Sequence, residues 1–249
     1  MTRPAIALVL PLLLLPCAAR AEIIEPQREY RACLSLAQSK PDEGWEEAIA
    51  WQSLGGGEPA RHCAALALIG QGKYEEGAKR LEALAQQSRR EESLRAEMLA
   101  QAAQAWMLAT QPERALADLD TALGLVPGQP DLILDKAVLL ASQGHHAEVV
   151  GLLTGLLKAQ PNRVEALTLR ASAQRLLDHS AEAEKDITRA LELDPAYPDA
   201  LLERGMIRRG GGNEAGARAD WMRAIEIAPE GPAADTARRN IELMDVKVK

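Results

Sequence analysis

Three of the four histidines stand where a metal-binding group could form. His145 and His146 are adjacent, His179 has Asp178 beside it, and His145 and His179 occupy equivalent positions of a repeated sequence pattern. Imidazole nitrogens bind zinc at about 2 Å, whereas the turns of neighbouring helical hairpins lie about 10 Å apart. Two imidazoles on such turns would need a third ligand, which the sequence does not supply. We therefore interpret these histidines as polar residues of exposed turns, interpret the isolated His62 as a packing or surface residue, and expect no metal site.

The cysteines offer oxidative chemistry. Cys33 and Cys63 remain once an N-terminal leader that contains Cys17 is removed. In an oxidising compartment, a disulfide between them would close a loop of about 30 residues and stabilise the fold by about 3 kcal/mol. We expect this disulfide; the alternative is that both cysteines are small buried hydrophobic residues. Because no C-x-x-C motif is present, a thiol oxidoreductase of the thioredoxin type is not indicated.

No catalytic or cofactor motif accompanies these residues. The sequence contains no zinc-protease helix motif, P-loop or nucleophile elbow. The glycine-rich run GGGNEAG at 210–216 is not followed by the Lys-Ser or Lys-Thr pair of a phosphate-binding loop, so we expect it to form a turn between helices. We predict a protein that is not an enzyme and that binds no cofactor.

The composition indicates the elements that position these residues. The 249 residues are 47% hydrophobic but only 3% aromatic, and phenylalanine is absent. A core of alanine and leucine, with abundant Glu, Arg and Gln, is typical of an all-α protein because these residues favour helices. The formal net charge is −7, and no basic run exceeds two residues. Nucleic acids and anionic membranes attract clustered Lys and Arg, so neither is an expected partner.

Residues 1–21 have the three parts of a secretory signal peptide. These are Arg3 near the start, an apolar run, and a small-x-small cleavage site that ends at Ala21. The apolar run is shorter than the roughly 20 residues that span a bilayer. We expect cleavage after Ala21 and a periplasmic protein without stable membrane insertion. The alternatives are a lipoprotein with Cys17 as the lipidated residue and a retained membrane anchor.

A proline recurs at a fixed interval in the second half of the chain. The sequence numbers increase by 34 each time, through Pro127, Pro161, Pro195 and Pro229. Proline lacks a backbone N–H and disfavours helical geometry in the residue before it, so each should end one helix and let the next begin. With the proline at position 32, the units are 96–129, 130–163, 164–197 and 198–231. Position 8 is small in every unit, which lets two helices cross closely: Ala103, Ala137, Ala171 and Gly205.

Other positions of the unit are apolar each time, as expected of a buried core. Position 24 is Leu119, Leu153, Ile187 and Trp221, and position 4 is Leu99, Ile133, Leu167 and Leu201. Position 20 is Ala115, Val149, Ala183 and Ala217, and position 27 is Ala122, Leu156, Ala190 and Ala224. Agreement at several independent positions over four units predicts a stack of similar helical hairpins.

This period and pattern resemble the tetratricopeptide repeat. The resemblance implies an all-α fold: a right-handed α-solenoid of helix-turn-helix repeats with a C-terminal capping helix. A fifth unit, 58–95, has Ala65 at position 8 and Leu81 at position 24. It is four residues longer than the others, and we place the insertion within 86–93.

The two ends of the array depart from the repeat. We interpret residues 22–57 as a degenerate N-terminal hairpin, with helices near 30–39 and 43–54, Asp42 as an N-cap and the run Gly55–Gly57 as the end of the second helix. Residues 232–249 should be a capping helix and tail, because the last repeat needs cover for its apolar face. The apolar residues of this cap lie at helical spacing: Ala233, Ala237, Ile241 and Met244.

The resemblance also implies where a ligand would lie. In this family the first helices of successive units line a concave groove, which here would contain Leu66, Gln104, Met107, Leu108, Leu134, Val138, Ser172, Arg175, Met206 and Arg209. Position 2 of four units is acidic: Glu97, Asp131, Glu165 and Asp199. An apolar floor with polar edges suits an amphipathic helix or an extended peptide. Charge reversal of Arg175 and Arg209 should weaken binding of an acidic partner segment without unfolding the protein.

Together these features predict a non-enzymatic periplasmic scaffold that binds a peptide or helix of an envelope protein. Two alternatives assign it to particular assemblies. One is an accessory factor of cytochrome c assembly, which would bind peptides with a C-x-x-C-H motif. The other is an accessory protein of polysaccharide export.

Overall fold

The computed structural model describes residues 26–247. The expected signal peptide, including Cys17, lies outside the described residues. The described part contains thirteen helices: α1 (Pro26–Ser39), α2 (Pro41–Ser53), α3 (Gly57–Gly70), α4 (Tyr74–Gln87), α5 (Glu92–Leu108), α6 (Pro112–Leu125), α7 (Pro130–Ser142), α8 (His146–Ala159), α9 (Val164–Leu176), α10 (Ser180–Leu193), α11 (Pro198–Gly210), α12 (Glu214–Ile227) and α13 (Pro232–Lys247).

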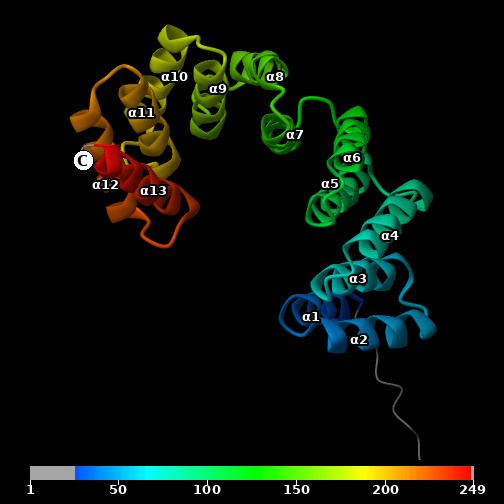
Figure 1. Cartoon of the computed structure of the whole chain (residues 1–249). Coiled ribbons are helices and arrows are strands. Elements are labelled where there is room, and N and C mark those ends of the chain that lie inside the picture. The colour runs from blue at the N-terminus through cyan, green and yellow to red at the C-terminus, as the bar shows by residue number, and fades with distance from the viewer. Residues whose placement is uncertain (1–25, 248–249) are drawn as a thin grey trace, which may run out of the picture.

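Consecutive helices pair and stack into a curved array (Figure 1). The recurring prolines lie in the loops between pairs, and α7, α9 and α11 begin at Pro130, Val164 and Pro198, one repeat period apart. In Figure 1, α5, α7 and α9 lie on the inner side of the arc, whereas α6, α8 and α10 lie on its outer side. The first helices of the central pairs therefore line the concave face.

The packing positions expected from the repeat are buried. At positions 8, 20, 24 and 27, every residue of the four units is buried. At position 4, Leu99, Leu167 and Leu201 are buried, and Ile133 is only partly buried. The predicted core is thus confirmed at these positions, and it consists mainly of alanine at the helix crossings with one large apolar residue filling each hairpin.

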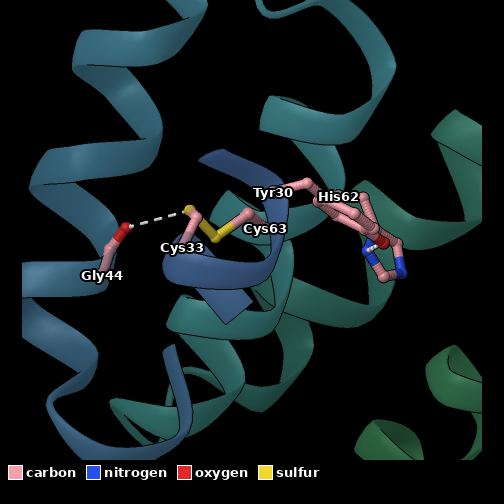
Figure 2. Close-up of a disulfide and its surroundings, with 5 residues drawn as sticks. All are labelled: Tyr30, Cys33, Gly44, His62 and Cys63. Atoms are coloured by element: carbon pink, nitrogen blue, oxygen red, sulfur yellow. Dashed lines mark hydrogen bonds between the residues drawn. A yellow bond between two sulfur atoms is a disulfide. The ribbon is translucent and has the colours of Figure 1, made fainter. Parts of the chain in front are cut away.

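The N-terminal hairpin packs against α3 through the predicted disulfide. Cys33 on α1 and Cys63 on α3 are joined with their Cα atoms 6.1 Å apart, and both side chains are fully buried (Figure 2). The prediction of Asp42 as the N-cap of α2 is wrong: the N-cap is Lys40, and Pro41 opens the helix. Proline suits the first helical position because its fixed φ fits a helix and its missing N–H would have no partner there. Gly55, at φ 88°, follows the end of α2 as expected.

The extra four residues of the fifth unit become one added helical turn. Helix α5 has 17 residues, whereas α7, α9 and α11 have 13 each. The loop before it keeps four residues, 88–91, as in the other units. Arg95 on the added turn donates from Nε to the carbonyl oxygen of Ala85 at 2.9 Å. The added turn therefore supplies one hydrogen bond between α5 and α4.

Helix α13 closes the C-terminal end. Ala233, Ala237 and Met244 are buried, and Ile241 is partly buried against the same cluster as Trp221. The predicted capping helix is confirmed, and it covers both α11 and α12. Of the helices within 26–247, none is long and apolar enough to cross a lipid bilayer.

Candidate functional site

The concave face carries a hollow between α5, α6 and α7, which we name the α5–α7 hollow. It measures about 350 Å³ and is lined by Ala100, Ala103, Gln104, Met107, Leu108, Leu119, Asp135, Val138 and Leu139. Almost all of its lining is apolar, and Asp135 is the only charged residue that the described part of the chain contributes to it. Position 5 of the repeat explains the space, because this unit has Ala100 where the following units have Leu134, Thr168 and Leu202.

Large apolar side chains remain exposed around this hollow. Met107 is 40% exposed, Leu108 56% and Val138 57%. Single exposed apolar residues are common on protein surfaces, but neighbouring ones around a concavity indicate an interaction site. The α5–α7 hollow is therefore the first candidate for ligand contact.

Two further hollows continue the groove on either side. One, of about 410 Å³, includes Glu97, Asp131 and Asp135 and shares Ala100 with the α5–α7 hollow. The other, of about 480 Å³, lies between α7, α9 and α11 and shares Val138. It includes Leu134, Glu165, Thr168, Leu169, Ser172, Tyr197, Asp199, Leu202 and Glu203. The three hollows together form one groove along the first helices.

The groove is acidic. Among residues 26–247, no Lys, Arg or His lines any of the three hollows, whereas six carboxylates do. The four acids at position 2 are all exposed. Arg163 contacts two of them, with Nη2 2.6 Å from Oδ1 of Asp131 and Nε 3.4 Å from Oε2 of Glu165. The groove therefore presents an excess of negative charge to a ligand.

Three groove acids, Glu97, Asp135 and Asp199, make no side-chain hydrogen bond or ion pair within residues 26–247, unlike Asp131, Glu165 and Glu203. Asp135 is the one of these three that lines the α5–α7 hollow, and its neighbour Lys136 pairs with Asp120. Partial burial, and secondarily the charge of Asp131, raise the pKa of the Asp135 carboxyl. Its negative charge is thus poorly compensated by the protein itself.

Arg175 is not a free cation, which changes the expectation made for it. Its Nε lies 2.5 Å from Oε1 of Glu203, and the Glu203 side chain is only 9% exposed. Charge reversal at Arg175 would place a second carboxylate against a buried one, and breaking a buried pair commonly costs about 3 to 5 kcal/mol. The variant would therefore disturb folding, contrary to the expectation of intact structure.

The ten predicted groove residues fall into two sets. Six of them line the hollows: Gln104, Met107, Leu108, Leu134, Val138 and Ser172. The other four face neighbouring parts of the protein. Leu66 packs on the core, Met206 receives the side-chain N–H of Asn240 at 3.2 Å, Arg209 lies 5.9 Å from the Trp221 ring centre, and Arg175 pairs with Glu203.

Sequence reasoning missed Asp135 and Glu203, the groove acids at position 6. The available signal was the separation of 28 between Arg175 and Glu203, which joins position 12 of one unit to position 6 of the next. The same separation links Met107 to Asp135. Only the first of these combinations has complementary charges.

The histidines take structural positions. His145 lies 2.8 Å from Glu148 in an exposed turn. His62 is buried between Tyr30 and Gln101, with its Nδ1 2.8 Å from the Tyr30 hydroxyl and its Nε2 2.6 Å from Oε1 of Gln101. Burial lowers the pKa of His62 more than the Gln101 and Glu97 contacts raise it. No cluster of three potential metal ligands occurs within 26–247.

The glycine-rich run forms the predicted turn between α11 and α12. Gly212 has a φ of 81°, and the Asn213 side chain accepts a hydrogen bond of 2.9 Å from the backbone N–H of Gly216 at the start of α12. The asparagine is therefore an ordinary helix N-cap.

Two models of the tetratricopeptide repeat match the sequence, over residues 107–173 and 172–232. No curated protein matches it. Similar solved structures include MamA, from residue 41 to its end, of Desulfovibrio magneticus RS-1, with 17% identity, a TM-score of 0.58, and coverage of 70% of this chain and 97% of that one. TTC0263, a thermophilic TPR protein of Thermus thermophilus, has 18% identity and a TM-score of 0.57, over 75% of this chain and 98% of that one.

A third similar structure is YrrB, described as a TPR protein with an unusual peptide-binding site. It has 17% identity and a TM-score of 0.54, over 77% of this chain and 96% of that one. Identities this low concern the fold alone. The expected fold, an all-α, right-handed solenoid of tetratricopeptide helix-turn-helix repeats, is confirmed.

Proposed function

Because the chain belongs to the tetratricopeptide repeat family, we propose that it is a non-enzymatic scaffold whose concave groove holds a helix or extended segment of another protein. One observation supports the groove as the site: the α5–α7 hollow shares Ala100 and Asp135 with one neighbouring hollow and Val138 with the other, so the three adjoin one another along the first helices. Exposed apolar side chains at Met107, Leu108 and Val138 could take the apolar anchors of such a segment.

We also propose that the protein acts in the periplasm. Two features support this location: the leader-like residues 1–21 and the disulfide between Cys33 and Cys63. Disulfides persist mainly in oxidising compartments outside the cytosol. The partner is accordingly an envelope protein.

The groove can be tested by site-specific photo-crosslinking in cells. A photoreactive amino acid in place of Leu108 tests the groove. The same photoreactive amino acid in place of Lys158, which is exposed on α8, is the control on the second helix of a hairpin. We expect a discrete adduct from Leu108 that disappears when Val138→Asp is added, because a carboxylate would disrupt an apolar anchor site.

Equal adducts from both positions, or an adduct unaffected by Val138→Asp, would contradict the groove as the binding site. Mass spectrometry of the Leu108 adduct would identify the bound segment. A C-x-x-C-H motif in that segment would assign the protein to cytochrome c assembly.

A further inference from the structure

We infer that the α5–α7 hollow is a pocket for one lysine or arginine side chain of the partner, with Asp135 as its counter-ion. This inference rests on the proposed function and specifies the chemistry of the bound segment. The segment would be basic and amphipathic, rather than acidic as the sequence alone suggested.

The protein contains its own example of such a pair. Arg175, at position 12 of one unit, holds Glu203, at position 6 of the next, and both lie on consecutive first helices. Between the units 130–163 and 164–197, the same two positions are Ala141 and Leu169, which carry no charge. The equivalent positions at the α5–α7 hollow are Met107 and Asp135. The acid is present there, but an apolar side chain stands where the arginine would be.

The shape of the hollow suits the stem of a long cationic side chain. Lysine and arginine bury their methylene groups against apolar surfaces while the charged head reaches a polar partner. Among the described residues, Ala103, Leu119 and Leu139 form an apolar wall, and the only charged residue beside it is Asp135, which is exposed and also borders the adjoining hollow. A side chain that entered along Met107 and Val138 would thus bring its charge to Asp135.

The surrounding charges favour the same ligand. Glu97 and Asp131 line the adjoining hollow together with Asp135, and no basic side chain of the described part of the chain lines the three hollows. Charged surfaces of complementary sign accelerate association and exclude partners of the same sign. Of the six groove carboxylates, Asp131 and Glu165 pair with Arg163 and Glu203 pairs with Arg175. An acidic segment would be repelled by the remaining three, Glu97, Asp135 and Asp199, whereas a basic segment would be attracted to them.

The pocket can be tested with three synthetic peptides that form the same amphipathic helix. Each contains leucine and alanine, and the polar positions are lysine in the first, glutamine in the second and glutamate in the third. Affinity is measured by fluorescence anisotropy at physiological salt for the wild-type protein and three variants. Asp135→Asn removes the counter-ion, Met107→Arg supplies an internal cation as Arg175 does, and Glu184→Gln removes an exposed charge of α10 as the matched control.

We expect the lysine peptide to bind the wild type more tightly than the glutamine peptide, and the glutamate peptide to bind least. Asp135→Asn should lower the affinity for the lysine peptide about tenfold, because one charge-assisted hydrogen bond is lost. Met107→Arg should weaken it at least as much. Asp135→Asn should not weaken binding of the glutamine peptide. Met107→Arg should weaken binding of that peptide less than binding of the lysine peptide, because it also replaces an apolar side chain of the groove. Glu184→Gln should leave all affinities unchanged. Because Met107 is 40% exposed, an arginine can be accommodated there, and thermal unfolding checks the fold of each variant.

Equal affinity for the lysine and glutamine peptides, or equal losses from Asp135→Asn and Glu184→Gln, would overturn the cation pocket. If the glutamine peptide still bound and Val138→Asp abolished that binding, the groove function would survive without the pocket. Absence of binding by the lysine peptide would also overturn the pocket, whereas the Leu108 crosslink decides the groove independently.

Discussion

Gly205 and Trp221 are matched in size across one helical hairpin. A β-carbon on Gly205 would lie 2.3 Å from Nε1 of Trp221, which is fully buried and donates to the carbonyl oxygen of Leu202 at 3.1 Å. In the unit 96–129, the same two positions are Ala103 and Leu119. The last unit therefore accommodates a tryptophan because its partner has no side chain.

Gly205→Ala should accordingly destabilise the protein. Overpacking a core costs about 1 to 3 kcal/mol, and the better helix propensity of alanine returns at most about 1 kcal/mol. Trp221→Leu alone should lower the free energy of unfolding by leaving a cavity. The double variant recreates the alanine and leucine combination of the unit 96–129, so its loss should be smaller than the sum of the two single losses. Urea unfolding measures all three, and simple additivity would show that the two sites are not matched.

A buried ion pair links the two helices of the unit 164–197. Arg170 contacts both carboxylate oxygens of Asp186 at 2.7 Å, and the Asp186 side chain is 7% exposed. Arg170→Met should lower the free energy of unfolding by about 3 kcal/mol, because it leaves a buried carboxylate without a partner. Arg218→Met, which breaks the exposed pair with Asp245, should change it by less than about 1 kcal/mol. Similar losses from both variants would contradict this distinction.

The period of the sequence predicted the packing well because each buried position was sampled four times. Alanine at a helix crossing and one large apolar residue per hairpin are local requirements of every unit, so repetition separates them from chance. The N-cap of α2 was mispredicted because the degenerate hairpin occurs once. There, the preference of Pro41 for the first helical position outweighed the capping ability of Asp42.

The groove was less predictable because its charges depend on pairs between units. Arg175 and Arg209 have the same position in their units, but only Arg175 has an acid at position 6 of the following helix pair, which is Glu203. The sequence numbering of a single unit cannot show whether such a charge is free or paired. The space in the α5–α7 hollow depends similarly on Ala100, whose small size matters only beside α7.

The disulfide between Cys33 and Cys63 should contribute substantially to stability. Its cysteines are 30 residues apart, and the chain-entropy model gives about 3 to 4 kcal/mol for a loop of this length. We expect Cys33→Ala with Cys63→Ala to lower the midpoint of urea unfolding, and a reducing agent to lower that of the wild type to a similar extent. The double variant itself should be insensitive to the reductant. A wild-type protein that ignores the reductant under unfolding conditions would contradict the prediction.

Asp118 lacks the arginine that its equivalents have. Asp186 and Asp220, at the same position of later units, pair with Arg170 and Arg204 on the preceding helices. The residue equivalent to these arginines in the unit of Asp118 is Ala102. Burial, followed by the charge of Glu82, raises the pKa of Asp118 to about 7. One of its carboxyl oxygens, Oδ2, is buried and has no hydrogen-bond partner among residues 26–247.

A carboxyl whose pKa is higher in the folded protein stabilises the fold when protonated and loses that contribution as the pH rises. For Asp118 the loss extends from its unfolded pKa of 3.8 to about 7. Asp118→Asn stays neutral at every pH, so its stability relative to the wild type should improve by about 1 to 3 kcal/mol between pH 5 and pH 8, since one pKa unit is about 1.4 kcal/mol. Urea unfolding at both pH values measures this difference. The exposed control Glu184→Gln should follow the wild-type pH profile, and an Asp118→Asn profile parallel to it would show that Asp118 titrates normally.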